Sequence, residues 1–138
     1  MDKFAMIIFG ASGDLTKRKL MPALYSLYRE KRLTGEYSIL GIGRTVYSDD
    51  NYRSYILEEL QQFVKSEEQD TALMASFVSH LYYLPMDPAK EEGYPQLRQR
   101  LVDLTGEVDP DNLLFYLATP PSLYGVVPLY LKAAGLNT

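Results

Sequence analysis

Residues 7–20 read Ile7-Ile8-Phe9-Gly10-Ala11-Ser12-Gly13-Asp14-Leu15-Thr16-Lys17-Arg18-Lys19-Leu20. An apolar run ends at Phe9, a short turn lies between Gly10 and Gly13, and an amphipathic segment follows it. A buried strand, a glycine turn and a helix are how a dinucleotide-binding sheet begins. Because glycine has no Cβ, such a turn can bring the backbone close to a pyrophosphate. This stretch therefore predicts a phosphate-binding strand–turn–helix unit.

Three cations, Lys17, Arg18 and Lys19, follow the turn directly. Pro22 lacks an N–H and fits best in the first turn of a helix, which predicts that the helix begins within this basic cluster. The positive end of a helix dipole disfavours cations by a few tenths of a kcal/mol each, so an anion in the turn would explain their presence. A triphosphate loop is excluded, because Asp14 stands where that motif requires lysine.

Four apolar runs alternate with amphipathic segments along the chain, at residues 4–9, 37–43, 81–84 and 112–118. This alternation predicts right-handed crossovers and an α/β fold, a Rossmann-like doubly wound parallel sheet with helices on both faces. Four strands are fewer than the roughly six of a complete dinucleotide-binding sheet. We therefore expect residues 1–138 to form one domain that is incomplete at the C-terminus and belongs to a longer protein.

Several residues mark the expected ends of helices. Asp49 and Asp50 are candidate N-caps for the helix after the second strand, and Ser122 is a candidate N-cap for the last helix. Gly106 and Gly135 are placed to end the last two helices.

The composition excludes several classes of protein. A net charge of −4 argues against a general nucleic-acid or anionic-membrane binder, so an anion site must be a local cluster. The absence of cysteine excludes a disulfide framework and a thiolate metal site. No apolar run approaches the roughly 18 residues of a membrane span, and the acidic residues have no metal-ligand spacing. We expect a cytoplasmic protein with no bound metal.

Arg44 directly follows the second predicted strand, in the sequence Gly41-Ile42-Gly43-Arg44-Thr45. NAD-binding domains place an acid there to accept hydrogen bonds from the ribose 2′-hydroxyl. A guanidinium instead matches the geometry of a phosphate. The sequence therefore favours NADP over NAD, although a solvated arginine at a strand end would look the same.

Three blocks of the sequence resemble one family. The glycine turn with its basic cluster, residues 10–20, closely resembles the N-terminal signature of the glucose-6-phosphate dehydrogenases. Residues 41–44 and the block Phe115-Tyr116-Leu117-Ala118-Thr119-Pro120-Pro121-Ser122 continue the resemblance in the family's order, over essentially the whole chain. It implies transfer of a hydride from glucose 6-phosphate to NADP, giving 6-phosphogluconolactone, by a full-length enzyme that is a homo-oligomer.

The resemblance also implies roles for individual residues. Arg44 would bind the 2′-phosphate, Asp87 would lie at the adenosine end, Pro120 would pass near the nicotinamide, and Lys19 would reach the substrate. The residues expected to line the phosphates of the cofactor are Gly10, Ala11, Ser12, Gly13, Asp14, Leu15, Thr16 and Lys17.

The catalytic histidine motif of the family is missing from these 138 residues. The one histidine, His80, precedes the third predicted strand in a segment that resembles no catalytic motif. We therefore expect a cofactor-binding part that does not itself turn over substrate. Two alternatives remain open, namely a non-catalytic dinucleotide-binding or sensing module, and a structural domain with an empty glycine turn.

Overall fold

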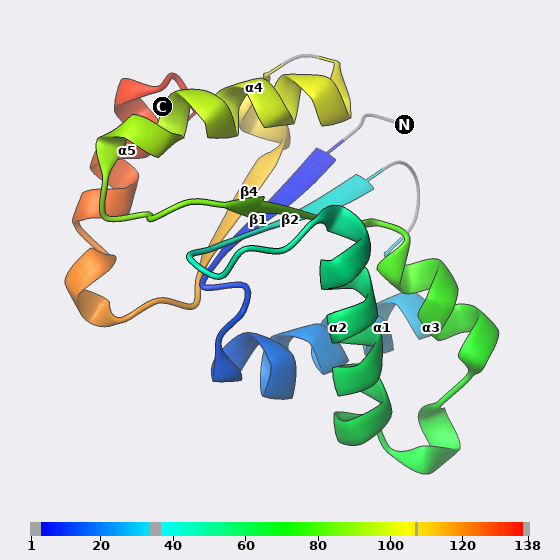
Figure 1. Ribbon diagram of the computed structural model, residues 1–138. Helices are drawn as coiled ribbons and strands as arrows, with labels where there is room; N and C mark the ends of the chain where they lie inside the picture. The colour runs from blue at the N-terminus through cyan, green and yellow to red at the C-terminus, as the bar shows by residue number, and fades with distance from the viewer. Residues whose placement is uncertain (1–3, 34–36, 107, 137–138) are drawn as a thin grey trace.

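The computed structural model describes residues 4–33, 37–106 and 108–136, which form a parallel sheet between two layers of helices (Figure 1). The strands are β1 (Phe4–Phe9), β2 (Tyr37–Gly43), β3 (Leu81–Pro85) and β4 (Leu113–Leu117). Their order across the sheet is β3-β2-β1-β4. All three strand pairings are parallel. The four predicted strands are confirmed, with ends that differ by no more than one residue.

β1 lies in the middle of the sheet, which explains why its sequence is apolar without alternation. Met6 is opposite Ile39 of β2 on one side and Leu114 of β4 on the other. Helices cover both faces of this strand, and residues 5–9 are all buried. A strand buried on both faces has no polar side to show in its sequence.

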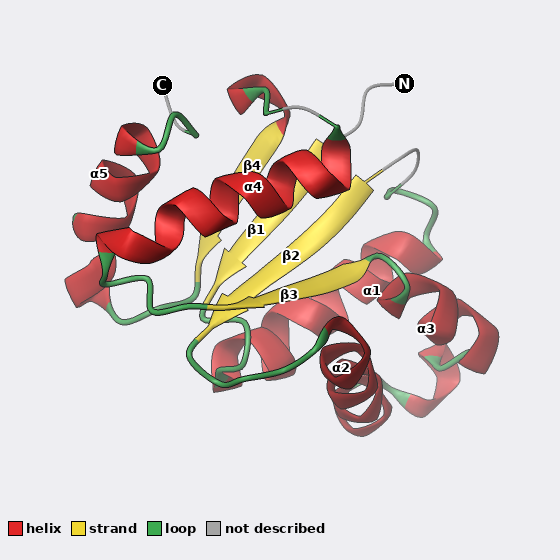
Figure 2. Ribbon diagram, turned by 45° about the horizontal axis from the view of Figure 1, so that its top comes forward, coloured by secondary structure: helices red, strands yellow, loops and turns green. Residues whose placement is uncertain are grey.

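Helices lie on both faces of the sheet, as predicted (Figure 2). The helices on one face are α1 (Met21–Arg29), α2 (Asp49–Phe63) and α3 (Thr71–Val78). Those on the other face are α4 (Tyr94–Thr105) and α5 (Val126–Ala133). Each layer closes its own hydrophobic core against the sheet. The doubly wound α/β fold is thereby confirmed.

The first helix differs from the prediction at its start. Helical structure begins at Asp14, continues as a π-helix over Thr16–Leu20, and becomes α1 at Met21. The N–H of Met21 donates to the carbonyl of Thr16, five residues back. The helix therefore starts before the predicted basic cluster, and Pro22 lies in the first turn of α1, directly after the π turn.

The predicted helix caps are partly wrong. The N-cap of α2 is Ser48, whose hydroxyl accepts a hydrogen bond from the N–H of Asn51 at 3.1 Å. Ser122 lies within a 3-10 turn, Pro121–Leu123, and α5 begins after Gly125. The glycine ends are confirmed: Gly106 and Gly135 have φ angles of 89° and 77°, the left-handed conformation that ends many helices.

Side chains of α2 close the outer edge of β3. Asp49 Oδ1 accepts a hydrogen bond from the N–H of Tyr83 at 2.8 Å, and Arg53 Nε donates to the carbonyl of Leu81 at 2.8 Å. Asp49 also pairs with Arg100 of α4, on the opposite face of the sheet. Backbone groups that would otherwise invite another strand are thus occupied.

The opposite edge of the sheet is different. β4 leaves Leu114 and Tyr116 exposed by 57% and 37%, on the face that carries α1, α2 and α3. Among the described residues no strand pairs with β4 on its outer side.

Replacing Asp49 with asparagine is expected to lower the free energy of unfolding by about 1 kcal/mol. Asparagine can still accept the hydrogen bond from Tyr83, but it loses the charge that pairs with the half-buried Arg100. The matched control is Asp50→Asn, because the Asp50 carboxylate is 93% exposed where it pairs with Arg53. Urea denaturation of both variants measures this difference. Equal losses of unfolding free energy would show that the Asp49–Arg100 pair stabilises the protein no more than the exposed Asp50–Arg53 pair.

Candidate dinucleotide site

A cleft of about 780 Å³ lies at the carboxyl ends of the strands. The chain leaves β1 toward β2 on one side and returns to β4 on the other, so this is the switch point where α/β sheets bind ligands. The residues lining the cleft are Gly10, Ser12, Gly13, Gly43, Arg44, Thr45, Asp87, Pro88, Ala89, Ala118, Thr119, Pro120, Ser122 and Leu123.

The glycine turn is held by its own backbone. The N–H groups of Gly10 and Ala11 both donate to the carbonyl of Ile42, at 2.9 and 3.0 Å, and the N–H of Gly13 donates to the carbonyl of Gly10 at 3.0 Å. Gly10 has a φ of 88°, and a Cβ added there would lie 2.3 Å from the carbonyl oxygen of Ala118. Glycine is therefore required where the turn meets the end of β4.

Of the eight residues expected to line the cofactor phosphates, only some line the cleft. Gly10, Ser12 and Gly13 line the cleft, as expected for a phosphate turn. Ala11 and Thr16 are fully buried, and the Thr16 hydroxyl donates to the carbonyl of Gly10 at 2.9 Å. These two shape the turn from inside. Asp14 and Leu15 are exposed and, like Lys17, are not among the residues that line the cleft.

Lys17 lies over α2. Its Nζ is 3.6 Å from a carboxylate oxygen of Asp14 and 4.0 Å from one of Glu59. Electrostatic interaction with Tyr55 raises the pKa of Lys17, Glu59 and Asp14 raise it further, and burial opposes them. Lys17 therefore has acidic partners within the protein, and its presence does not require an anion in the turn.

The other two cations of the basic cluster differ from each other. Arg18 Nε is 3.5 Å from Asp14, and the guanidinium carbon is 5.1 Å from the centre of the Phe63 ring. Lys19 is exposed and makes no ion pair with any described residue. Of this cluster, Lys19 alone has its charge available to a ligand.

Arg44 also has a free charge, and it lines the cleft. Its side chain is exposed and makes no ion pair or hydrogen bond within the described part of the chain. Asp87, from the loop after β3, also lines this cleft, and its Oδ1 accepts a hydrogen bond from the N–H of Ala89 at 2.9 Å. The structure thus brings Arg44, Asp87 and Pro120 together with the glycine turn.

The sequence reasoning did not single out Thr119. Its hydroxyl is buried beside the cleft and has no hydrogen-bond partner among the described residues. A buried polar group without a partner is unusual in a folded protein. Its place in the sequence, between the end of β4 and Pro120-Pro121, could have marked it as a residue at the carboxyl end of the sheet.

His80 takes no part in this cleft. Its ring stacks on that of Tyr37 with centroids 4.2 Å apart, and its Nδ1 lies 3.1 Å from the carbonyl of Tyr37. No three acidic or histidine side chains within residues 4–33, 37–106 and 108–136 are grouped as metal ligands. Across the same ranges, no helix has the length and apolar character needed to cross a bilayer.

Residues 7–138 match the family model described as "Glucose-6-phosphate dehydrogenase, NAD binding domain". The chain belongs to the glucose-6-phosphate dehydrogenase family. It is 44% identical over 133 residues to the glucose-6-phosphate 1-dehydrogenase of Aggregatibacter actinomycetemcomitans, covering 96% of this chain and 26% of that protein. The Bacillus subtilis (strain 168) enzyme is 35% identical over 138 residues, covering 98% and 27%. The chain thus spans about a quarter of the length of these glucose-6-phosphate dehydrogenases.

Solved structures of glucose-6-phosphate dehydrogenases have the same fold over this region. The crystal structure of the Mycobacterium avium enzyme superposes with a TM-score of 0.81 at 28% identity, covering 96% of this chain and 27% of that one. A glucose-6-phosphate dehydrogenase in complex with its substrate glucose-6-phosphate gives a TM-score of 0.81 at 35% identity, covering 96% and 28%.

Proposed function

We propose that residues 1–138 are the NADP-binding part of a glucose-6-phosphate dehydrogenase that oxidises glucose 6-phosphate to 6-phosphogluconolactone. The observation that carries the choice of NADP is the free guanidinium of Arg44, which lines the cleft that begins at the glycine turn. A 2′-phosphate would give this charge a partner with matching geometry.

The residues of the cleft fit a dinucleotide. We assign the pyrophosphate to the turn that Gly10, Ser12 and Gly13 present, which has no side-chain bulk at two of its three positions. Asp87 would lie toward the adenosine end. Pro120 would lie toward the nicotinamide. When bound, the cofactor accepts the hydride; the residues of this chain bind and orient it.

We assign the substrate side of the site to Lys19, which does not itself line the cleft. Its side chain is exposed and unpaired, so its ammonium is available for the phosphate or a hydroxyl of the sugar. The group that takes the proton from the sugar is assigned to a part of the enzyme outside these residues, because His80 is stacked on Tyr37 away from the cleft. General-base catalysis requires direct hydrogen-bond reach.

Calorimetric titration of the full-length protein with NADP and NAD tests this function. NADP is expected to bind about tenfold or more tightly than NAD, the scale of a charge-assisted contact. Addition of glucose 6-phosphate with NADP should then produce NADPH absorbance. Binding without turnover would favour a sensing module, and failure to bind either nucleotide would favour an empty turn.

A further inference from the structure

Two tyrosine hydroxyls connect the loops of the cleft to the sheet and to α2. Tyr83, from β3, donates to the carbonyl of Thr45 at 2.6 Å. Tyr52, from α2, donates to the carbonyl of Ala11 at 3.0 Å. Thr45 is the neighbour of Arg44, and Ala11 belongs to the glycine turn. The Tyr83 hydroxyl also interacts with the Ser12 side chain of that turn, so Tyr83 supports the Arg44 loop and touches the turn, whereas the Tyr52 hydroxyl bonds to the turn alone.

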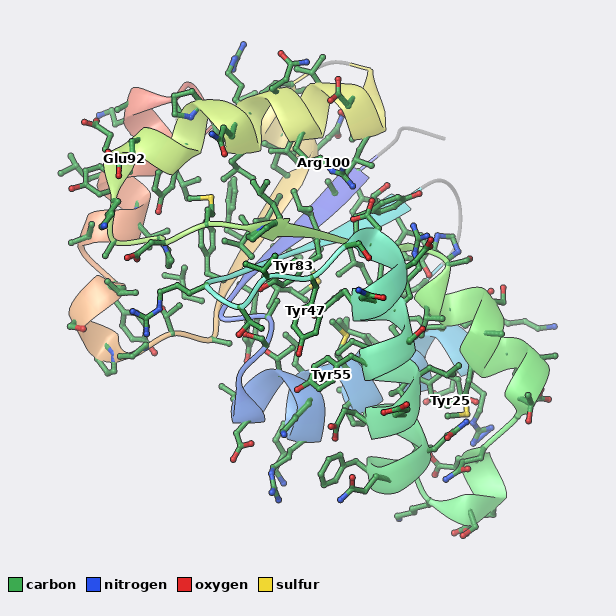
Figure 3. All side chains as sticks on the ribbon, viewed as in Figure 1. Tyr25, Tyr47, Tyr55, Tyr83, Glu92 and Arg100 are labelled. Atoms are coloured by element: carbon green, nitrogen blue, oxygen red, sulfur yellow. The ribbon has the colours of Figure 1, made fainter. Side chains whose placement is uncertain are left out.

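The two tyrosines belong to an aromatic cluster of Tyr47, Tyr52, Tyr55 and Tyr83 on the α2 side of the sheet. Figure 3 shows Tyr83, Tyr47 and Tyr55 gathered between the ends of the strands and α2. The rings of Tyr52 and Tyr83 are 4.7 Å apart. Tyr47, from the same loop as Arg44, meets Tyr83 edge-on at 5.3 Å. Tyr83 therefore holds this loop by its ring as well as by its hydroxyl.

Glycines in β2 make room for both hydroxyls. A Cβ added at Gly43 would lie 2.7 Å from the hydroxyl oxygen of Tyr83, and one at Gly41 would lie 3.1 Å from that of Tyr52. At Gly43 the added Cβ would collide with the Tyr83 hydroxyl, and at Gly41 it would collide with Ala11 Cβ at 2.6 Å and crowd the Tyr52 hydroxyl. Both side chains are packed in the interior and are not surface contacts, since Tyr52 and Tyr83 are 0% and 3% exposed.

Both hydroxyls remain donors in the neutral range of pH. Burial is the main cause that raises the pKa of Tyr83 to about 12, and burial also raises the pKa of Tyr52 well above its usual value. Neither hydroxyl loses its proton near neutral pH, so both hydrogen bonds persist over that range.

From this geometry we infer that Tyr83 is a positioning residue for nucleotide selectivity, and that it fixes the Arg44 loop for a phosphate on the adenosine ribose. Tyr52 fixes the glycine turn, which NAD and NADP use alike. The inference rests on the proposed function, because Arg44 has to be the group that meets the 2′-phosphate. It adds a residue that does not line the cleft and that acts on the nucleotide indirectly, mainly through the Arg44 loop. Any effect of Tyr83 through Ser12 falls on NAD and NADP alike and cancels in the ratio of their affinities.

The test compares the affinities of the full-length protein for NADP and NAD by calorimetry. The variants are Tyr83→Phe, Tyr52→Phe and Tyr25→Phe, each of which removes one hydroxyl from a buried ring. Tyr25 is the matched control, because its hydroxyl also donates to a backbone carbonyl, that of Glu68 at 2.9 Å, away from the cleft. Tyr83→Phe is also made together with Arg44→Ala.

Tyr83→Phe is expected to reduce the preference for NADP over NAD by about two- to tenfold, the scale of one hydrogen bond. Tyr52→Phe should weaken the binding of both nucleotides by a similar factor, and Tyr25→Phe should weaken the binding of neither. In the Arg44→Ala background, Tyr83→Phe should not change the ratio of the two affinities further. The ratio of affinities is insensitive to partial unfolding, because both nucleotides meet the same folded fraction.

Equal effects of Tyr83→Phe on the two nucleotides, or none, would overturn the inference if Arg44→Ala abolishes the preference. An Arg44→Ala variant that keeps its preference for NADP would instead overturn the assignment of Arg44, and the inference with it. The two failures are therefore told apart within one set of titrations.

Discussion

Gly10→Ala is expected to destabilise the domain by about 3–5 kcal/mol and to abolish nucleotide binding. Gly10 has a φ of 88°, a conformation that strains any residue with a Cβ. The added methyl group would lie 2.3 Å from the carbonyl oxygen of Ala118, so two backbone segments would have to move apart. Both segments line the cleft.

Two other glycines separate the causes of this loss. Gly106 has nearly the same φ, 89°, but a Cβ there would meet nothing within 4 Å, so Gly106→Ala should cost only about 1–2 kcal/mol. Gly125 has a negative φ and open space around it, so Gly125→Ala should change stability by no more than about 0.5 kcal/mol. Urea denaturation of the three variants measures this order. A Gly10→Ala variant no less stable than Gly106→Ala would refute the close contact with Ala118.

Arg44→Ala is expected to weaken NADP binding by about 1.5–3 kcal/mol, or about 10- to 150-fold, and to leave NAD binding nearly unchanged. The guanidinium has no acidic partner among the described residues, so its removal leaves no unpaired charge in the protein. The whole effect should then fall on the ligand phosphate. Calorimetric titration of the full-length protein with each nucleotide measures it.

The matched control for Arg44→Ala is Arg18→Ala. Arg18 is an exposed cation of the same chain that pairs with Asp14 and lies over Phe63, outside the cleft. Its removal should leave both affinities nearly unchanged. Similar losses for Arg18→Ala and Arg44→Ala would show a general effect of net charge in place of a specific contact.

The parts of this fold that could be predicted from sequence are those set by local pattern. The unbroken apolar run of β1 predicts a strand buried on both faces, and the left-handed glycines end their helices as expected. The glycine turn and Arg44 could be placed at one site because parallel strands bring their carboxyl ends to the same edge of a sheet.

The parts that could not be predicted depend on contacts between distant residues. Lys17 finds Glu59 on another helix, so its charge is explained without a bound anion. The hydrogen bond between Tyr83 and Thr45 depends on the pairing of β2 with β3 and on the space above Gly43. Neither contact can be inferred from the spacing of residues along the sequence. The start of the first helix was missed for a different reason: a π turn precedes Pro22, whereas the proline rule assumes regular α-helix.

The two edges of the sheet differ in whether they can accept a further strand. At β3 the outward N–H of Tyr83 and the carbonyl of Leu81 are already bonded to side chains of α2, so an added strand would have to displace Asp49 and Arg53. At β4 no such barrier is present among the described residues, and Leu114 and Tyr116 offer an apolar surface next to the open edge. A further strand can therefore be added at the β4 edge but not at the β3 edge. A strand engineered to extend the sheet has to pair with β4, because the side chains of Asp49 and Arg53 block pairing with β3.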